Sequence, residues 1–452
     1  MQDVQDFKRR LTSDGAVQGF LQQSRAASPI TLARAPGRLD VMGGVADYSG
    51  SLVAEMTIAE AALVALAPRT DRRLRFWSLG IEAEGLTPQA DLSLDDFRID
   101  GFLTNYADVQ ARLRADAGTR WAAYLAGCFY VLSAEGVLPD FPHGANVVLD
   151  SRVPLGAGVS SSAAIEVATM QAISAAYGLG LDGVTLARLA QMVENRVVGA
   201  PCGIMDQMTS ALGVANGLLL ILCQPHEVQG TQDLPPGVRV FGINSNVKHS
   251  VGGSAYTRAR VAAFMGRRIL GVDHLAQIAP HAGQFVVEAP GEMTGAEFMG
   301  LYGETGDTVT TVDAEATYPV QAAARHGILE NGRVQRFVHF LSGDGSPVSL
   351  ERAGKLMYES HDSYGQIGLG CAETDLLVSL ARDAGPDKGI FGAKITGGGS
   401  GGTVAFLTYG DGVEQTIQGI ANTYQQQTGL MPQIFEGGLS PGALAFGHET
   451  LT

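Results

Sequence analysis

The chain has 452 residues, more than one ordinary hydrophobic core accommodates, so two packed domains are expected. Hydrophobic residues make up 45% of it, too large a share for a disordered chain. Its formal net charge of −15 argues against a nucleic-acid partner, because binding to a phosphate backbone needs a basic face.

The N-terminus and the cysteines both indicate a protein of the cell interior. The first ten residues lack the apolar stretch of a signal peptide, and the apolar run from Leu218 to Cys223 is too short to cross a bilayer. The four cysteines are widely spaced, and the nine histidines form no metal-binding motif. We therefore expect a soluble, cytoplasmic protein with reduced thiols and no membrane partner.

The first half of the chain is predicted to open with strands and to continue with helices. Residues 30–68 alternate short apolar runs with turn residues, which predicts strands on either side of a turn at Gly43 and Gly44. Helices are expected at 105–135, at 163–176 and from Thr185 to Gly199, with a strand at 144–149.

The segment Pro154-Leu-Gly-Ala-Gly-Val-Ser-Ser-Ser-Ala-Ala-Ile-Glu166 lies between that strand and an alanine-rich helix. Its two glycines let the backbone approach oxyanions closely, and its serines offer hydroxyls and an N-cap for the helix. The positive end of the helix would then face the loop. The spacing matches neither the Gly-x-x-x-x-Gly-Lys loop nor the Gly-x-Gly-x-x-Gly dinucleotide motif. We interpret this segment as a phosphate-binding loop for a nucleotide.

A polar, proline-bearing stretch from Gln224 to Val238 is the expected domain boundary. It gives a first domain over residues 25–223 and a second α+β domain over 238–452. Helices of the second domain are predicted at 254–270, 320–326, 334–341, 350–363 and 373–384, and strands at 392–395 and 403–407.

Two more glycine-bearing segments accompany the phosphate loop. Residues 33–50 contain a proline-glycine turn, a lone arginine, a Gly-Gly pair and an acidic residue, and Lys394-Ile-Thr-Gly-Gly-Gly-Ser-Gly-Gly-Thr403 has five glycines in six positions. In this order the three segments resemble the GHMP kinases, a family that includes galactokinases, homoserine kinases and mevalonate kinases. Segments that resemble galactokinases in particular are Cys202–Gln207, Asn246–Ser250 with Tyr256, and Leu356–His361.

The resemblance covers roughly residues 30–445 and implies an α+β, two-domain GHMP kinase fold. The N-terminal domain would be like the second domain of ribosomal protein S5, with a left-handed β-α-β unit. The C-terminal domain would be ferredoxin-like. The small-molecule partners implied are ATP and an acceptor, with Mg²⁺ as the cofactor; the oligomeric state is left open.

Phosphoryl transfer needs positioning, charge neutralisation and a partner for the hydroxyl proton. The resemblance places Asp206 at the acceptor hydroxyl and Arg38 beside it. A guanidinium keeps the carboxylate ionised, which makes it a good proton acceptor or orienter but a weak base. Whether Asp206 removes the proton early or late is left open.

Mg²⁺ prefers oxygen ligands and keeps several waters, so one hydroxyl and one carboxylate suffice beside the phosphates. Ser162 and Glu194 fit these roles, with Ser161 as the alternative hydroxyl. Lys394 and the loop Gly397–Gly402 are expected to close on the nucleotide or acceptor side, with Thr396 and Ser400 as hydrogen-bond donors. The residues expected to bind the nucleotide are Gly156, Gly158, Ser160, Ser161, Ser162, Ala163, Gly398 and Gly399.

The acceptor end departs from the galactokinase pattern. Where galactokinases have Glu-His-Thr-Asp-Tyr, this chain has Gly44-Val-Ala-Asp-Tyr48. The family uses the Glu-His pair to hold the C6 hydroxyl, so Gly44 and Val45 suit a galactose-like pyranose without a hydroxymethyl group, such as L-arabinopyranose. Asp47 is retained for the ring hydroxyls. Gly203 and Tyr256 are expected in the same pocket.

Further segments resemble L-arabinokinases more than galactokinases: Gly43–Gly50, Cys223–Pro225, Ser250–Ser254 and Tyr318–His326. The predicted activity is therefore ATP-dependent phosphorylation of the anomeric hydroxyl of L-arabinose. One alternative is a galactokinase with relocated C6 contacts. The other is a regulator that binds sugar and ATP without turnover; such proteins lose the Ser-Ala pair that this chain keeps at Ser162 and Ala163. A galacturonate kinase fits less well, because Gly44 and Val45 offer no cationic side chain for the C6 carboxylate of galacturonate.

Overall fold

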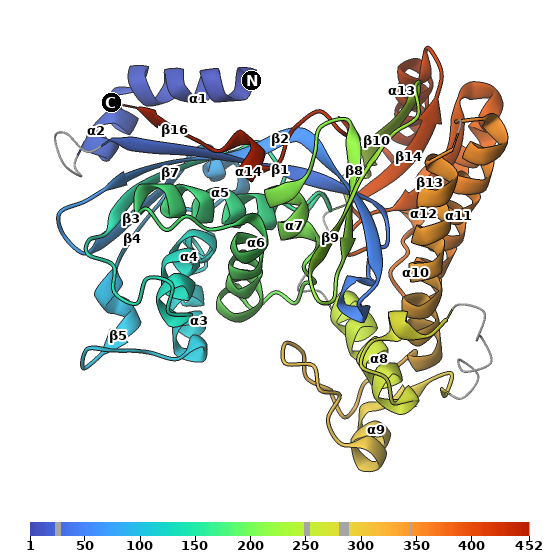
Figure 1. Ribbon diagram of the computed structural model, residues 1–452, viewed down its shortest axis with the longest axis horizontal. Coiled ribbons are helices and arrows are strands. Elements are labelled where there is room, and N and C mark those ends of the chain that lie inside the picture. The colour runs from blue at the N-terminus through green and yellow to red at the C-terminus, as the bar shows by residue number, and fades with distance from the viewer. Residues whose placement is uncertain (23–28, 248–253, 280–288, 344, 452) are drawn as a thin grey trace.

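The computed structural model describes residues 1–22, 29–247, 254–279, 289–343 and 345–451, and it has two lobes, each built around a sheet (Figure 1). Residue 25, where the first predicted domain begins, and residue 452, where the second ends, lie outside the described residues. Residues 248–253 also lie outside them; they belong to two segments that resemble galactokinases or L-arabinokinases, Asn246–Ser250 and Ser250–Ser254. No helix in the described part of the chain is long and apolar enough to cross a membrane.

The first lobe contains an eight-stranded sheet in the order β16-β1-β2-β7-β3-β4, with β8 on β2 and β9 on β8. Its strands are β1 (Ile30–Met42), β2 (Leu52–Pro68), β3 (Arg73–Ser78), β4 (Gln89–Ser93), β7 (Ala145–Ser151), β8 (Gly217–Leu222), β9 (Glu227–Asp233) and β16 (His448–Leu451). Successive side chains of a strand point to opposite faces of a sheet. Accordingly, Val64 and Leu66 belong to the main core with the central helices, whereas Leu63 and Ala65 pack with α1 and α2 on the other face.

The helices of this lobe are α1 (Gln2–Ser13), α2 (Gly15–Gln22), α3 (Tyr106–Arg114), α4 (Ala122–Ala134), α5 (Ser161–Ala176), α6 (Gly183–Met192) and α7 (Met205–Leu212). A π-helical turn, Val193–Val198, extends α6 as far as Gly199. The single helix predicted over 105–135 is interrupted, because residues 115–121 form a turn in which Asp116 accepts a hydrogen bond from the amide of Gly118. Helices α1 and α2 were not predicted from the sequence.

The second lobe has a four-stranded sheet in the order β13-β14-β10-β15. Its strands are β10 (Val238–Asn244), β13 (Ile390–Ile395), β14 (Thr403–Tyr409) and β15 (Gln433–Glu436), and its helices are α8 (Ser254–Leu270), α9 (Gly295–Tyr302), α10 (Val320–Leu341), α11 (Pro347–Gln366), α12 (Ala372–Ala384) and α13 (Val413–Thr428). A short hairpin pairs β5 (Arg98–Ile99) with β6 (Phe102–Leu103), and a separate two-stranded sheet pairs β11 (Met293–Thr294) with β12 (Thr317–Tyr318).

The helices predicted at 320–326 and 334–341 are one continuous helix, α10. Gly327 lies where the apolar pattern fails, and a Cβ there would come within 2.8 Å of the Ser49 hydroxyl of the first lobe. The helix continues through this position, and the residue is a glycine because the close contact between the lobes leaves no room for a side chain.

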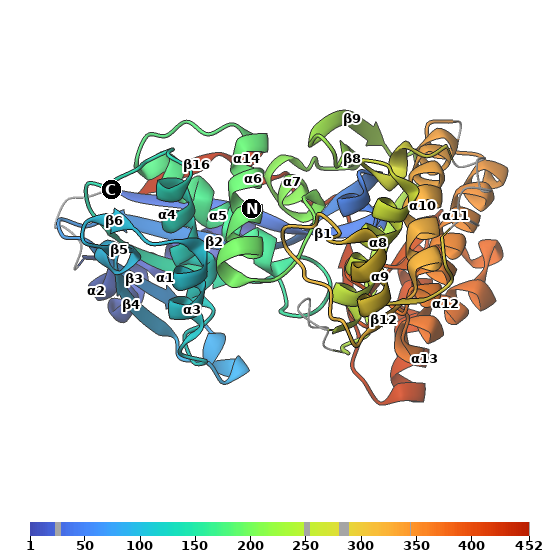
Figure 2. The same cartoon turned by 90° about the horizontal axis from the view of Figure 1, so that it is seen from below.

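The two lobes are joined by a common hydrophobic cluster and by the C-terminal strand, which returns to the first sheet. One hydrophobic cluster contains Val64 of the first sheet and Val240 and Leu407 of the second. After the second lobe the chain returns through α14 (Ala443–Phe446), and β16 pairs with β1 in the register Leu451 to Ile30. The last strand of the predicted range 238–452 therefore lies in the first sheet. Seen from below, α8 and α9 lie beside the junction of the lobes (Figure 2).

Candidate active site

The phosphate loop leads from β7 into α5, and its backbone has the conformation expected of an oxyanion cradle. Gly156 and Gly158 both have φ of 73°, and Ser160 has φ of 59°, in the left-handed region that favours glycine. Ser160 occupies the N-cap position of α5, but its side chain makes no capping hydrogen bond. The amides at the start of α5 are therefore left without that cap, as an anion site requires.

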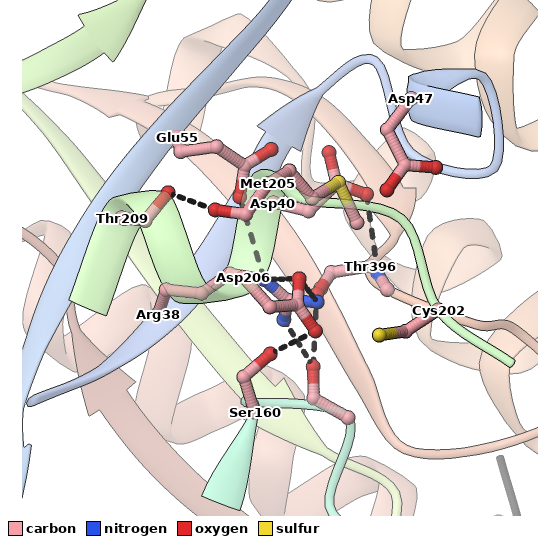
Figure 3. A network of polar contacts seen from close by, with 12 residues as sticks. Arg38, Asp40, Asp47, Glu55, Ser160, Cys202, Met205, Asp206, Thr209 and Thr396 are labelled. Carbon is pink, nitrogen blue, oxygen red and sulfur yellow. Dashed lines mark hydrogen bonds and ion pairs between the residues drawn. The ribbon is translucent and has the colours of Figure 1, made fainter. Parts of the chain in front are cut away.

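The hydroxyl of Ser160 donates instead to Asp206 Oδ2 at 2.6 Å. Asp206 lies in the first turn of α7, and Arg38 reaches it from β1 (Figure 3). Arg38 donates to Asp206 Oδ1 from Nε at 2.9 Å and from Nη2 at 2.7 Å. The predicted pair is thus brought together at the phosphate loop, although its residues are 168 positions apart.

Arg38 is surrounded by carboxylates. Burial opposes its charge, but Asp206, Glu55 and Asp40 outweigh burial and raise the pKa of Arg38. Glu55 Oε2 lies 3.4 Å from Arg38 Nε, and Glu55 faces Asp40 across the β1–β2 register. Burial and the nearby Asp40 raise the pKa of Glu55 well above its usual range. Arg38 therefore keeps its positive charge beside Asp206.

The glycine loop of the second lobe closes over the phosphate loop. The carbonyl of Gly158 accepts hydrogen bonds from Arg38 Nη1 at 2.7 Å and from the Thr396 hydroxyl at 3.3 Å. A Cβ on Gly402 would lie 3.0 Å from the carbonyl oxygen of Ala157. The two loops, far apart in sequence, thus form adjacent walls of one site.

Glu194 and Ser162, which were predicted to hold a cation, lie within hydrogen-bonding distance of each other. Burial raises the pKa of Glu194 to about 7, and a hydrogen bond from Ser162 acts in the opposite direction. Gln207 Nε2 donates to Glu194 at 2.7 Å and to the buried Glu166 at 3.1 Å, which orients the Glu194 carboxylate. No group of three or more His, Cys, Asp or Glu that could hold a metal occurs among the described residues. A cation here would complete its shell with phosphate and water, which suits Mg²⁺.

Asp47 and Gly203, both predicted to bind the acceptor, pack against each other. Burial and the nearby charge of Asp206 raise the pKa of Asp47 to about 6. A Cβ on Gly203 would lie 1.6 Å from Asp47 Oδ2, so this glycine leaves room for the carboxylate. Tyr256 stacks edge-on against Tyr48 with ring centroids 6.2 Å apart.

A small cavity of about 70 Å³ joins these groups. The predicted site residues that line it are Arg38, Val45, Asp47, Gly156, Gly158, Ser160, Ser161, Ser162, Glu194, Gly203, Asp206, Tyr256 and Gly398. Of the other predicted residues, Gly44 packs against Asp40, a Cβ on Gly399 would meet Leu369, and Ala163 is fully buried in α5. Lys394, Thr396 and Ser400 do not line the cavity either: Lys394 is fully buried and pairs with Asp40, and the Thr396 hydroxyl donates to the Gly158 carbonyl.

A larger cavity of about 660 Å³ adjoins the phosphate loop, and the sequence analysis did not predict it. Val153, Pro154 and Leu155, directly before Gly156, form part of its wall, and Trp121 and Ile165 contribute apolar surface. Its volume and mostly apolar lining are typical of a site for a nucleoside-sized ligand. The apolar pair Pro154 and Leu155, directly before the glycines, is the sequence feature that could have indicated this cavity.

The two glycine loops and the Arg38–Asp206 pair have the arrangement expected of a phosphotransferase site, and comparisons with known proteins give the family. The GHMP kinase N-terminal domain model matches residues 123–214, and the GHMP kinase C-terminal model matches residues 348–426. A galactokinase of Chloroflexus aggregans is 32% identical over 91% of this chain and 92% of its own length. The chain belongs to the GHMP kinase family.

Within this family the chain is of the galactokinase and L-arabinokinase type. The L-arabinokinase of Arabidopsis thaliana is 40% identical over 93% of this chain, but the chain spans only 46% of that protein. The crystal structure of Lactococcus lactis galactokinase with galactose superposes with a TM-score of 0.74 at 19% identity, over 93% of this chain and 95% of that one. The predicted GHMP kinase fold is confirmed.

Proposed function

We propose that the protein transfers the γ-phosphoryl group of ATP to the anomeric hydroxyl of L-arabinose, giving L-arabinose 1-phosphate and ADP. The observation that carries this proposal is the position of Asp206. Its carboxylate is held by Arg38 and Ser160 between the phosphate loop and the cavity that Val45 and Asp47 line.

In this proposal the adenosine of ATP occupies the 660 Å³ cavity and its phosphates bind the amides at the start of α5. Asp206 Oδ2 accepts a hydrogen bond from the anomeric hydroxyl. The hydroxyl oxygen forms a bond to the γ-phosphorus, the bond to the β-phosphate oxygen breaks, and the hydroxyl proton passes to Asp206. Arg38 stabilises the negative charge on Asp206 before the transfer and on the phosphoryl oxygens during it.

Ser162 and Glu194 would hold Mg²⁺, which neutralises charge on the transferring phosphates when bound. Glu194 needs no shift of its backbone for this role, because the π-helical turn and Gln207 already direct its carboxylate toward Ser162. π-helical turns of this kind are common at functional sites.

L-Arabinose is favoured by the apolar side chain of Val45 at the wall of the acceptor cavity. Galactose would have to bury its hydroxymethyl group there, and an unpaired buried hydroxyl costs about 1 to 3 kcal/mol. This cost corresponds to a preference for L-arabinose of roughly 10-fold to 100-fold in kcat/KM. The 40% identity to L-arabinokinase supports the same acceptor.

A coupled assay of ADP release across L-arabinose, galactose, D-fucose and galacturonate tests the proposal. We expect L-arabinose to be the best acceptor, with D-fucose between it and galactose, because a methyl group avoids the unpaired hydroxyl. Equal or better turnover of galactose would favour a galactokinase with relocated C6 contacts. Binding of sugar and ATP without any ADP release would favour a non-catalytic regulator.

A further inference from the structure

Gly44 is a glycine because of the space around it. Its φ lies outside the left-handed region, but a Cβ built on it would lie 2.0 Å from Asp40 Oδ2 and 2.1 Å from the Tyr364 hydroxyl. Real Cβ atoms essentially never approach another heavy atom within 3.0 Å. Any side chain at this position would therefore displace Asp40, Tyr364 or the loop itself.

Asp40 is held in place from several sides and is fully buried. Its Oδ2 accepts hydrogen bonds from Lys394 Nζ at 2.9 Å and from the amide of Gly397 at 3.1 Å. Lys394 is also fully buried, so moving Asp40 away would leave a buried ammonium group without its partner. In Figure 3, Asp40 lies in the polar network together with Glu55 and Arg38.

The position of Tyr364 is also fixed by its contacts. Its hydroxyl donates to the Gly397 carbonyl at 2.9 Å, and its buried ring lies 5.4 Å from Lys394 Nζ. The carbonyl of Gly44 lies 3.0 Å from the Nε2 of the buried His326. The backbone at Gly44 is thus held between α10 on one side and the side chains of Asp40 and Tyr364 on the other.

The next residue, Val45, has φ of 58°, a left-handed conformation that is unusual for a β-branched side chain. In this conformation its side chain is 2% exposed and lines the acceptor cavity with Asp47 and Tyr256. Strained residues of this kind persist where the surrounding structure determines them, often at ligand sites.

We propose that the buried cluster of Asp40, Lys394 and Tyr364 is a specificity determinant. It occupies the volume that a side chain at position 44 would need, so no polar group from this position reaches the acceptor, and the apolar side chain of Val45 forms the wall. The selection of acceptors is thereby set by residues that lie beneath the cavity. This inference rests on the proposed function for the identity of the acceptor.

A double-mutant cycle on thermal unfolding tests the packing part. Gly44→Ala should lower the Tm of the parent by roughly 2 to 6 °C, as overpacking does. In an Asp40→Ala/Lys394→Met/Tyr364→Phe background, where the ion pair is replaced by apolar side chains and the tyrosine hydroxyl is removed, the loss should be less than half as large. Gly242→Ala is the matched control, because a Cβ there would lie 2.7 Å from Leu39, outside the cluster, and its cost should be equal in both backgrounds. An equal cost of Gly44→Ala in both backgrounds would overturn the proposal.

The selectivity part adds Gly44→Glu to the same triple-variant background, which removes the obstructing groups and leaves no buried ammonium group to hold the new carboxylate away from the acceptor. We expect the ratio of kcat/KM for L-arabinose to that for galactose to fall at least about 10-fold relative to the parent. A folded variant with Gly44→Glu and an unchanged ratio would overturn the proposal, and if this variant does not fold, the unfolding cycle decides. Failure of the proposed function is a separate result: the parent would then not prefer L-arabinose, whatever the cycle shows.

Discussion

Arg38 directs two N–H groups at a single oxygen of Asp206: Nε and Nη2 lie 2.9 and 2.7 Å from Oδ1. The other oxygen, Oδ2, receives only the Ser160 hydroxyl, at 2.6 Å, among the described side chains. Oδ2 therefore keeps a lone pair for a further donor. This division of roles makes Oδ2 the expected acceptor of the sugar hydroxyl proton.

Asp206→Asn should lower kcat by on the order of 10² to 10⁴, because an amide cannot take the proton, while the KM for ATP stays near that of the parent. Steady-state kinetics measure both values, and circular dichroism checks the fold. Ser160→Ala is the matched control, because it removes one hydrogen bond to the same carboxylate and should cost less than about 10-fold. Turnover of the Asp206→Asn variant within a factor of about three of the parent would rule out the assignment.

Gly203→Ala should raise the KM for the sugar and leave the KM for ATP unchanged, since its Cβ would lie 1.6 Å from Asp47 Oδ2 and displace that carboxylate. Gly213→Ala is a matched control: a Cβ there would lie 2.4 Å from Thr57, so it is crowded but far from the cavity lining. Both variants should lose thermal stability. If both raise the sugar KM equally, Gly203 has no specific role at the acceptor.

The KM for the sugar should depend on pH through Asp47. Because burial raises the pKa of this carboxyl to about 6, it is ionised above pH 6 and protonated below it. Only the ionised form accepts hydrogen bonds from sugar hydroxyls with both oxygens. We expect KM to rise as the pH falls through 6. Asp47→Asn should bind the sugar more weakly with a KM that is flat over this range; a parent KM that is flat from pH 5 to 7 would contradict the prediction.

The raised pKa of Asp47 also makes the stability of the folded protein depend on pH. Stability falls as the pH rises, whereas sugar binding improves. The folded protein binds the Asp47 proton more tightly than the unfolded chain, so this residue contributes stability at low pH that is lost as the pH rises toward 6. Sugar binding to the ionised form should offset the loss. Thermal unfolding with and without sugar at pH 5 and pH 7 measures this: the stabilisation by sugar should be larger at pH 7.

Glu194→Gln and Ser162→Ala should each raise the Mg²⁺ concentration needed for half-maximal activity, because each removes one oxygen ligand. Titrations of Mg²⁺ at fixed ATP provide the measurement. Gln191→Ala, one helical turn before Glu194 on α6, is a control that should leave the requirement unchanged. An unchanged half-saturation in both test variants would place the metal elsewhere.

Much of the fold could be predicted because its elements carry strong local signals. The helix predicted at 254–270 matches α8, and the strand predicted at 403–407 lies within β14, since apolar periodicity and bounding glycines mark both. Prediction was wrong where packing outweighs local pattern. The helix α10 runs through Gly327, a residue that is unfavourable in a helix by itself but that the close packing of the neighbouring lobe requires.

For the site, the glycine and serine pattern was enough to identify the phosphate loop as a candidate, because backbone amides at a helix start suit phosphate. Arg38 and Asp206 were identified as candidates through the resemblance to GHMP kinases. The sequence could not show that Asp40, Lys394 and Tyr364 lie under Gly44, since they come from three separate elements, β1, β13 and α11. Nor could it show that Val45, and not Gly44, has the left-handed backbone. Contacts between distant segments depend on how the two lobes pack, and that was decided only by the tertiary structure.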